Sequence, residues 1–158
     1  MKPELGKPAP AADGRAFWLG RAAGEMADFH LADYRGKNIV LAFYPGDFTP
    51  VCTTELCDFR DNISALANLN ALVAGISTDT IEKHAEFARK YNFAFPLIDD
   101  SSKKIGEAYG VSGSLFSSAH RRALFVIDAS GNLVWQKVEL TTLFRTEAAK
   151  VAKVLSSL

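Results

Sequence analysis

The sequence has no excess charge of either sign, because 18 Lys and Arg residues balance 18 Asp and Glu residues. Proteins that bind nucleic acid or anionic membranes need a basic surface, so this balance indicates neither partner. No run approaches the roughly 18 consecutive apolar residues of a membrane-spanning helix. The first residues also lack the apolar segment of a secretory signal. We therefore expect a cytoplasmic protein.

Cysteine is scarce as well, since the 158 residues contain only Cys52 and Cys57. A chain of this length buries a sufficient core without disulfides or metal, and it predicts one domain over residues 1–158. The spacing of the cysteines is wrong for a zinc site, and the three histidines are isolated, so we expect neither metal nor cofactor. We expect each histidine on the surface or on a helix face. In a reducing compartment, two close cysteines are more often redox-active than structural.

What the chain does contain is a series of short strands and helices. Apolar and β-branched runs predict strands over residues 17–20, 26–31, 37–44, 71–77, 95–99, 123–128 and 133–138. Helical spacing of apolar residues predicts helices over 50–69, 81–91, 101–110 and 145–155. Parallel crossovers followed by an antiparallel hairpin predict an α/β protein with a thioredoxin-like fold. This fold has a mixed central sheet flanked by helices, here with an N-terminal β extension.

Two local features refine these predictions. Pro96 lacks a backbone N–H, so its strand should lie at a sheet edge, or Pro96 should lie where the strand begins. Ser101 and Ser102 have the chemistry of N-caps and are expected to begin the helix that follows them.

The most informative segment is the loop between the strand ending at Tyr44 and the helix predicted from Pro50. Cys52 lies at the start of that helix, where free backbone N–H groups and the helix dipole favour an anion. Such positions, and nearby arginines, favour the reactive thiolate form of cysteine. The alternative is that Cys52 is simply a small buried apolar residue. Thr49 is placed to aim its hydroxyl at the same point.

Cys57 lies five residues further along the same predicted helix. On an intact helix this spacing places the two Cα atoms about 8–9 Å apart. A disulfide needs a Cα separation of roughly 4.4–6.8 Å. Either Cys57 is an ordinary position on the apolar helix face, or the start of the helix unwinds during a redox cycle.

The loop resembles the active-site signature of the peroxiredoxins, Pro45-x-x-x-Thr49-x-x-Cys52. Residues 43–61 look like the bacterioferritin-comigratory-protein branch, also called peroxiredoxin Q. Further segments resemble this branch in the same order, over residues 6–10, 31–37, 75–79, 109–111 and 122–128. Val51 departs from the branch, whose members usually carry glycine there. Residues 50–56 also resemble the 1-Cys peroxiredoxins.

The resemblance implies a role for each matching residue of the loop. Cys52 would be the peroxidatic thiolate, which attacks the terminal oxygen of the peroxide. Thr49 would hydrogen-bond the thiolate and the peroxide, and Pro45 would shield the site from water. Cys57 would be the resolving cysteine.

The resemblance also implies an arginine network. Arg122 would stabilise the thiolate and the developing charge, and Glu55 would orient Arg122. Arg145 would be a second arginine of this network. From the residues alone, Arg121 and Arg122 are equally consistent with a solvated position before a strand.

The function implied is a thiol-dependent peroxidase of the atypical 2-Cys type, acting on hydrogen peroxide and organic hydroperoxides. A disulfide between Cys52 and Cys57 within one chain would be reduced by thioredoxin or a similar dithiol, in a monomer or homodimer. The alternatives are a 1-Cys peroxidase with a structural Cys57, and a thiol–disulfide oxidoreductase without peroxidase activity. A non-catalytic binding or chaperone protein on the same fold is a third alternative.

Overall fold

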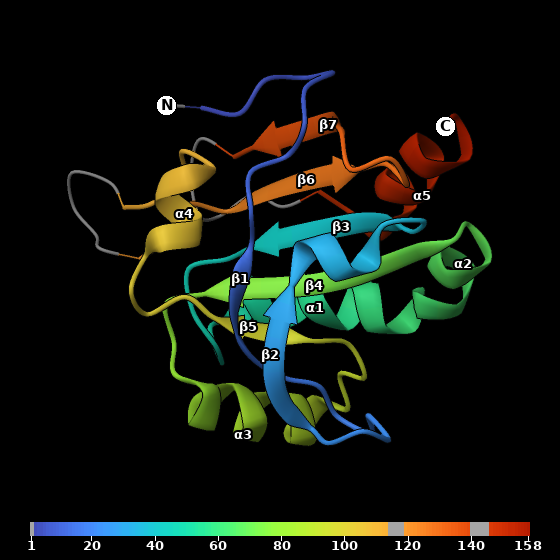
Figure 1. The fold of residues 1–158 in the computed structure, drawn as a ribbon. Coiled ribbons are helices and arrows are strands. Elements are labelled where there is room, and N and C mark those ends of the chain that lie inside the picture. Colours follow the sequence, from blue (N-terminus) through green and yellow to red (C-terminus); the bar gives the residue numbers. More distant parts are fainter. Residues whose placement is uncertain (1, 114–118, 140–145) are drawn as a thin grey trace.

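A computed structural model describes residues 2–113, 119–139 and 146–158. A seven-stranded sheet forms the centre of the protein (Figure 1). The strands lie side by side in the order β2-β1-β5-β4-β3-β6-β7. Their bounds are β1 Asp13–Phe17, β2 Met26–His30, β3 Asn38–Phe43, β4 Ala71–Ser77, β5 Leu97–Asp99, β6 Ala123–Ile127 and β7 Leu133–Val138. The middle strands β3, β4 and β5 are parallel, and the remaining neighbours pair antiparallel.

Helices connect the parallel strands and cover both faces of the sheet (Figure 1). They are α1 Pro50–Asp61, α2 Ile63–Asn68, α3 Ile81–Tyr91, α4 Lys104–Ala108 and α5 Ala148–Ser156, with the 3-10 helix η1 Leu31–Tyr34 after β2. One buried cluster contains residues of α1, α2, α3 and α5, and the other contains residues of η1 and α4. After Asn38, successive residues of β3 alternate between the two clusters, which is why the strand is apolar from Ile39 to Phe43.

The start of the sheet differs from the prediction. The first strand was expected over residues 17–20, but β1 is Asp13–Phe17, and Trp18 already lies in the turn that leads to β2. The prediction followed the apolar residues. β1 instead begins with exposed or half-buried polar residues, so an apolar run does not reveal it.

The helix predicted over 50–69 is divided at Asn62 into α1 and α2. Asn62 has φ −109° and ψ 11°, and its side-chain amide donates to the carbonyl oxygen of Asp58 at 2.8 Å. Asparagine side chains compete with backbone hydrogen bonds in this way, so the helix ends there.

The N-cap of the next helix is not Ser101 or Ser102 as predicted, although the hydroxyl of Ser102 accepts the backbone N–H of Lys104 at 3.4 Å. Helix α4 has Lys103 at its N-cap with φ 67°, and the carboxylate of Asp100 accepts the backbone N–H groups of Ile105 and Gly106. Strand β5 begins directly after Pro96, as one of the two alternatives predicted, and it lies inside the sheet between β1 and β4.

The C-terminal helix is tied to the helix that carries both cysteines. The N-cap residue of α5, Glu147, makes no side-chain capping bond. The Oδ2 atom of Asp58, next to Cys57 in α1, instead accepts the backbone N–H of Ala148 at 2.7 Å. The start of α5 is thus capped by a residue 90 positions earlier in the chain.

Among the residues described, none of the helices has the length and apolar character needed to cross a membrane.

Candidate active site

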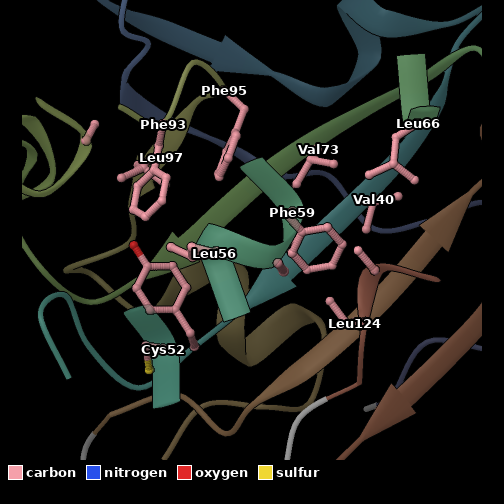
Figure 2. Close-up of a cluster of buried hydrophobic side chains, with 14 of the residues drawn as sticks. Val40, Cys52, Leu56, Phe59, Leu66, Val73, Phe93, Phe95, Leu97 and Leu124 are labelled. Atoms are coloured by element: carbon pink, nitrogen blue, oxygen red, sulfur yellow. The ribbon is translucent and has the colours of Figure 1, made fainter. Parts of the chain in front are cut away.

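The loop after β3 places Cys52 in the first turn of α1, as the sequence predicted. Thr49 is the N-cap, Pro50 is the first helical residue, and Cys52 is the third. Proline suits this position because its missing N–H would have no helical partner there. Cys52 has no exposed surface, and Figure 2 shows it on the same side of α1 as Leu56, at the edge of the buried cluster. The helix start holds the sulfur in a fixed, dry position.

Arg122 contacts the sulfur of Cys52. Its Nη2 atom donates to Cys52 Sγ at 3.2 Å, and its Nη1 atom lies 3.3 Å from Glu55 Oε1. The side chains of Arg122 and Glu55 are only 2% and 1% exposed. A buried guanidinium beside a sulfur can stabilise negative charge that develops there, and the carboxylate one turn later fixes the direction of the guanidinium. Arg122 is not a solvated residue, because it lies in the interior just before β6.

Thr49 and Pro45 lie on the approach to Cys52. The hydroxyl of Thr49 donates to the carbonyl oxygen of Gly46 at 2.9 Å, and Thr49 is exposed. A hydroxyl has one hydrogen and two lone pairs, so the oxygen of Thr49 remains able to accept a hydrogen bond. Pro45 is half-buried at the start of the same loop. The oxygen of Thr49 is therefore a hydrogen-bond acceptor at the start of α1.

Cys57 lies in α1 at some distance from Cys52, and both cysteines are free. The helix is continuous from Pro50 to Asp61, so the helical separation of about 8–9 Å applies to the two Cα atoms. Burial raises the pKa of the Cys57 thiol above its ordinary value; Arg60 lowers it in part, and Asp61 adds to the rise. Cys57 is therefore mainly a protonated thiol at neutral pH in this conformation.

Sequence reasoning missed two buried residues next to the loop. Asp47 and His84 lie 2.7 Å apart, between Asp47 Oδ2 and His84 Nδ1, and neither side chain is exposed. Each histidine was expected on the surface or on a helix face. His84 does lie on a helix face, the buried face of α3, whereas His120 is buried outside the helices, so the prediction is wrong for His120. Asp47 stands inside the cysteine loop, and that position was the only signal available.

One predicted site residue, Arg145, lies outside the described residues. Within residues 2–113, 119–139 and 146–158, no group of three or more His, Cys, Asp or Glu side chains is placed to hold a metal ion.

Comparison with known families and proteins supports the resemblance seen in the sequence. The AhpC/TSA family matches residues 5–136. Peroxiredoxin Bcp of Bacillus subtilis is 44% identical over 118 residues, which are 70% of this chain and 74% of that protein. A relative from Coxiella burnetii that carries the bcp name is 39% identical over 147 residues, or 89% of this chain and 93% of its own length. The chloroplastic peroxiredoxin Q of Sedum lineare is 40% identical over 101 residues, 64% of this chain and 54% of that one.

Solved structures share the whole architecture. The mitochondrial 2-Cys peroxiredoxin of Plasmodium falciparum superposes with a TM-score of 0.86 at 26% identity, over 98% of this chain and 93% of that one. AhpC of Enterococcus faecalis superposes with a TM-score of 0.88 at 22% identity, over 99% of this chain and 92% of that one. The predicted thioredoxin-like fold is thereby confirmed. The chain belongs to the AhpC/TSA family and, within it, to the group of the Bcp and Q peroxiredoxins.

Proposed function

We propose that this protein is a thiol-dependent peroxidase in which Cys52 reduces hydroperoxides and Cys57 resolves the oxidised form. The observation that carries the proposal is the buried contact of 3.2 Å between Arg122 Nη2 and Cys52 Sγ, in the first turn of a helix. Family membership supports peroxidase activity, and this contact supports Cys52 as the reacting thiol. The substrate class is hydrogen peroxide and organic hydroperoxides, and the electrons come from a thiol reductant.

In the first step, the thiolate of Cys52 attacks the terminal peroxide oxygen. The S–O bond forms while the O–O bond breaks, and the leaving oxygen takes a proton to become water or an alcohol. The oxygen of Thr49 accepts a hydrogen bond from the peroxide, and Arg122 stabilises the negative charge that moves across the O–O bond. Cys52 has no solvent exposure in this conformation, so peroxide reaches the sulfur only when surrounding side chains move.

In the second step, Cys57 attacks the sulfenic acid of Cys52, and water leaves as the disulfide forms. The intact helix keeps the thiols too far apart for this bond, so α1 must unwind between them. Burial also raises the pKa of Cys57 in the folded helix, so the reactive thiolate is favoured once unwinding brings the residue into water. The geometry therefore separates the two steps in time.

In the third step, a dithiol reduces the disulfide by thiol–disulfide exchange through a mixed disulfide. We propose thioredoxin or a similar dithiol as this reductant, acting on a protein of one domain in the cytoplasm. No metal or organic cofactor takes part in the cycle.

Mass spectrometry after one equivalent of hydrogen peroxide tests the proposal. The expected product has lost two hydrogens and carries a disulfide between Cys52 and Cys57 within one chain. A stable sulfenic acid would instead indicate a 1-Cys peroxidase, and a disulfide between chains would exclude the intramolecular cycle. Failure of the reduced protein to consume peroxide would exclude peroxidase function altogether.

A further inference from the structure

A buried hydrogen-bond network lies directly behind the loop that leads to Cys52. Asp47 Oδ1 accepts the hydroxyl of Tyr44 at 2.6 Å, and Asp47 Oδ2 lies 2.7 Å from His84 Nδ1. Nε2 of His84 lies 3.0 Å from the carbonyl oxygen of Ile98. None of these groups takes part in the three chemical steps proposed above. The network nevertheless connects three elements: the active-site loop, α3 and β5.

The partners fix the position of every proton in this network except one. A carbonyl oxygen can only accept, so His84 Nε2 must carry a hydrogen and donate it to Ile98. The hydroxyl of Tyr44 donates to Asp47 Oδ1. Two acceptor atoms cannot approach to 2.7 Å unless a proton lies between them, so the Asp47–His84 contact holds one proton. The bonds to Ile98 and from Tyr44 therefore have a defined direction, and the Asp47–His84 contact shares one proton.

The surroundings fix the backbone of Asp47 as well. Its N–H donates to Asp79 Oδ2 at 2.7 Å, and the same oxygen accepts the hydroxyl of Ser77 at 2.8 Å. Lys83 pairs with the other oxygen of Asp79 at 3.1 Å. Asp47 is thus anchored through its side chain and its backbone.

The next residue, Phe48, shows why the loop needs such anchoring. Its φ of 65° lies in the left-handed region, which is unfavourable for a side chain of this size. The ring of Phe48 packs against Phe87 with centroids 4.9 Å apart. The loop therefore makes an unfavourable bend between Asp47 and Thr49, and contacts on both sides of the bend hold it.

We propose that Asp47 and His84 are positioning residues of the peroxidase. Their hydrogen bonds hold the 44–49 loop in the conformation that presents Pro45 and Thr49 beside Cys52. The pair touches neither the sulfur nor the substrate and acts only through the loop. The inference rests on the proposed role of Cys52 as the thiol that reacts with peroxide.

The test compares Asp47→Ala with Asp47→Asn in a Cys57→Ser background, where only Cys52 reacts. Asparagine keeps both bonds, since its carbonyl accepts from Tyr44 and its amide donates to Nδ1 of a neutral His84. Misplacement of reacting groups by about 1 Å costs on the order of 100-fold in rate. We expect the alanine variant to react with hydrogen peroxide roughly 100-fold more slowly, and the asparagine variant to stay within about threefold of the parent protein.

A second measurement on the same variants separates positioning from general damage to the site. Alkylation of Cys52 by iodoacetamide needs the thiolate and access to the buried sulfur, but not the hydrogen bond between Thr49 and peroxide. A loosened loop can only widen that access, so we expect this rate not to fall by more than about threefold in either variant. Equal losses in both reactions would overturn the proposal, and so would an asparagine variant as slow as the alanine variant.

The surface pair Asp13 and His30 provides the matched control. Their closest side-chain atoms lie 3.4 Å apart, and both side chains are about half exposed, so Asp13→Ala should leave the peroxide rate unchanged.

A spectroscopic measurement tests the network independently of peroxidase activity. Nitrogen-15 NMR of the imidazole, assigned with His84→Gln, should show a slowly exchanging hydrogen on Nε2 in the parent protein and in Asp47→Asn. A bare Nε2 would overturn the proposed network even if Cys52 were the peroxidatic residue. Conversely, if Cys52→Ser kept full activity, the proposed function would fail while the imidazole signal stayed as expected.

Discussion

The two cysteines of this protein lie in one helix and have opposite surroundings. Cys52 is the third residue of α1, is fully buried, and accepts a hydrogen bond from Arg122. Cys57 is the eighth residue, is half-buried, and has a pKa raised by burial. The residue type is the same, so the position in the helix and the contact with Arg122 distinguish the two cysteines.

This difference gives the proposed cycle its order. In the proposed cycle the folded helix presents Cys52 to peroxide and at the same time keeps Cys57 protonated and out of reach. Resolution requires the loss of helical structure, so the fold that activates the first thiol also delays the second. Each of the following variants alters one of the two cysteines or its surroundings.

The largest effect is expected from Cys52→Ser. A serine hydroxyl cannot form the thiolate that attacks peroxide, so peroxide consumption should fall to the background rate. The measurement is the decrease of hydrogen peroxide in the presence of reduced thioredoxin. Normal turnover in this variant would mean that Cys57, or no cysteine, is the reacting residue.

Cys57→Ser should remove recycling while keeping the first reaction. The rate of Cys52 oxidation in a single turnover should remain within about twofold of the parent rate, because Cys57 touches no reacting atom. Steady-state activity with thioredoxin should disappear, and mass spectrometry should show no disulfide within the chain. Unchanged recycling would mean that Cys57 is structural.

Arg122→Met tests what distinguishes the surroundings of Cys52. The change removes the donor to Cys52 Sγ and keeps a side chain of comparable length. Loss of one electrostatic contact of this type costs about 100–1,000-fold in rate, so we expect a decrease of that size in the peroxide reaction.

The double variant Arg122→Met with Glu55→Gln serves as the control for Arg122→Met. Arg122→Met takes away the guanidinium that faces the buried carboxylate of Glu55, which should lower the melting temperature. Glu55→Gln removes that negative charge, so the double variant should regain thermal stability while its reaction with peroxide stays slow. Recovery of the rate as well would show that Arg122 acts only on folding.

The smallest effect concerns the pKa of Cys57. Asp61 raises this pKa, so Asp61→Asn should lower it and increase the alkylation rate of Cys57 at pH 8 by about twofold to threefold, measured in a Cys52→Ser background. An unchanged alkylation rate would show that Asp61 does not raise the pKa of Cys57.

The same raised pKa links Cys57 to stability. Because the folded pKa lies above the unfolded one, the stability that Cys57 contributes is present below the ordinary cysteine pKa and is lost as pH rises through the folded pKa.

The sequence predicted the parts of the fold whose signal is local. The strand over 71–77 matches β4, and the hairpin around residues 129–132 connects β6 and β7 as expected. Those segments are apolar runs bounded by turn residues, so each contains its own signal. β1 was misplaced because its first residues are polar and are held by pairing with β2, which a local pattern does not contain.

The site, too, was predicted only where its residues are close together in the sequence. The cysteine loop was found because its residues are contiguous and follow a family signature. The pairing of His84 was not predicted, because its partners Asp47 and Ile98 lie 37 and 14 residues away in the chain. His120 likewise pairs with Asp100, and a Cβ atom at Gly106 would lie 2.2 Å from its ring. Only the assembled fold shows that a histidine occupies the space left by a glycine.

The hydrogen bond from Ala148 to Asp58 links α1 to α5, so unwinding of α1 can affect the C-terminal helix. Asp58 follows Cys57 directly, so any unwinding that includes Asp58 also withdraws the acceptor from the first turn of α5. A helix start that loses its cap frays, at a cost of about 1 kcal/mol. In the proposed cycle, unwinding of α1 that includes Asp58 would therefore also weaken the start of α5, 90 residues further along the chain.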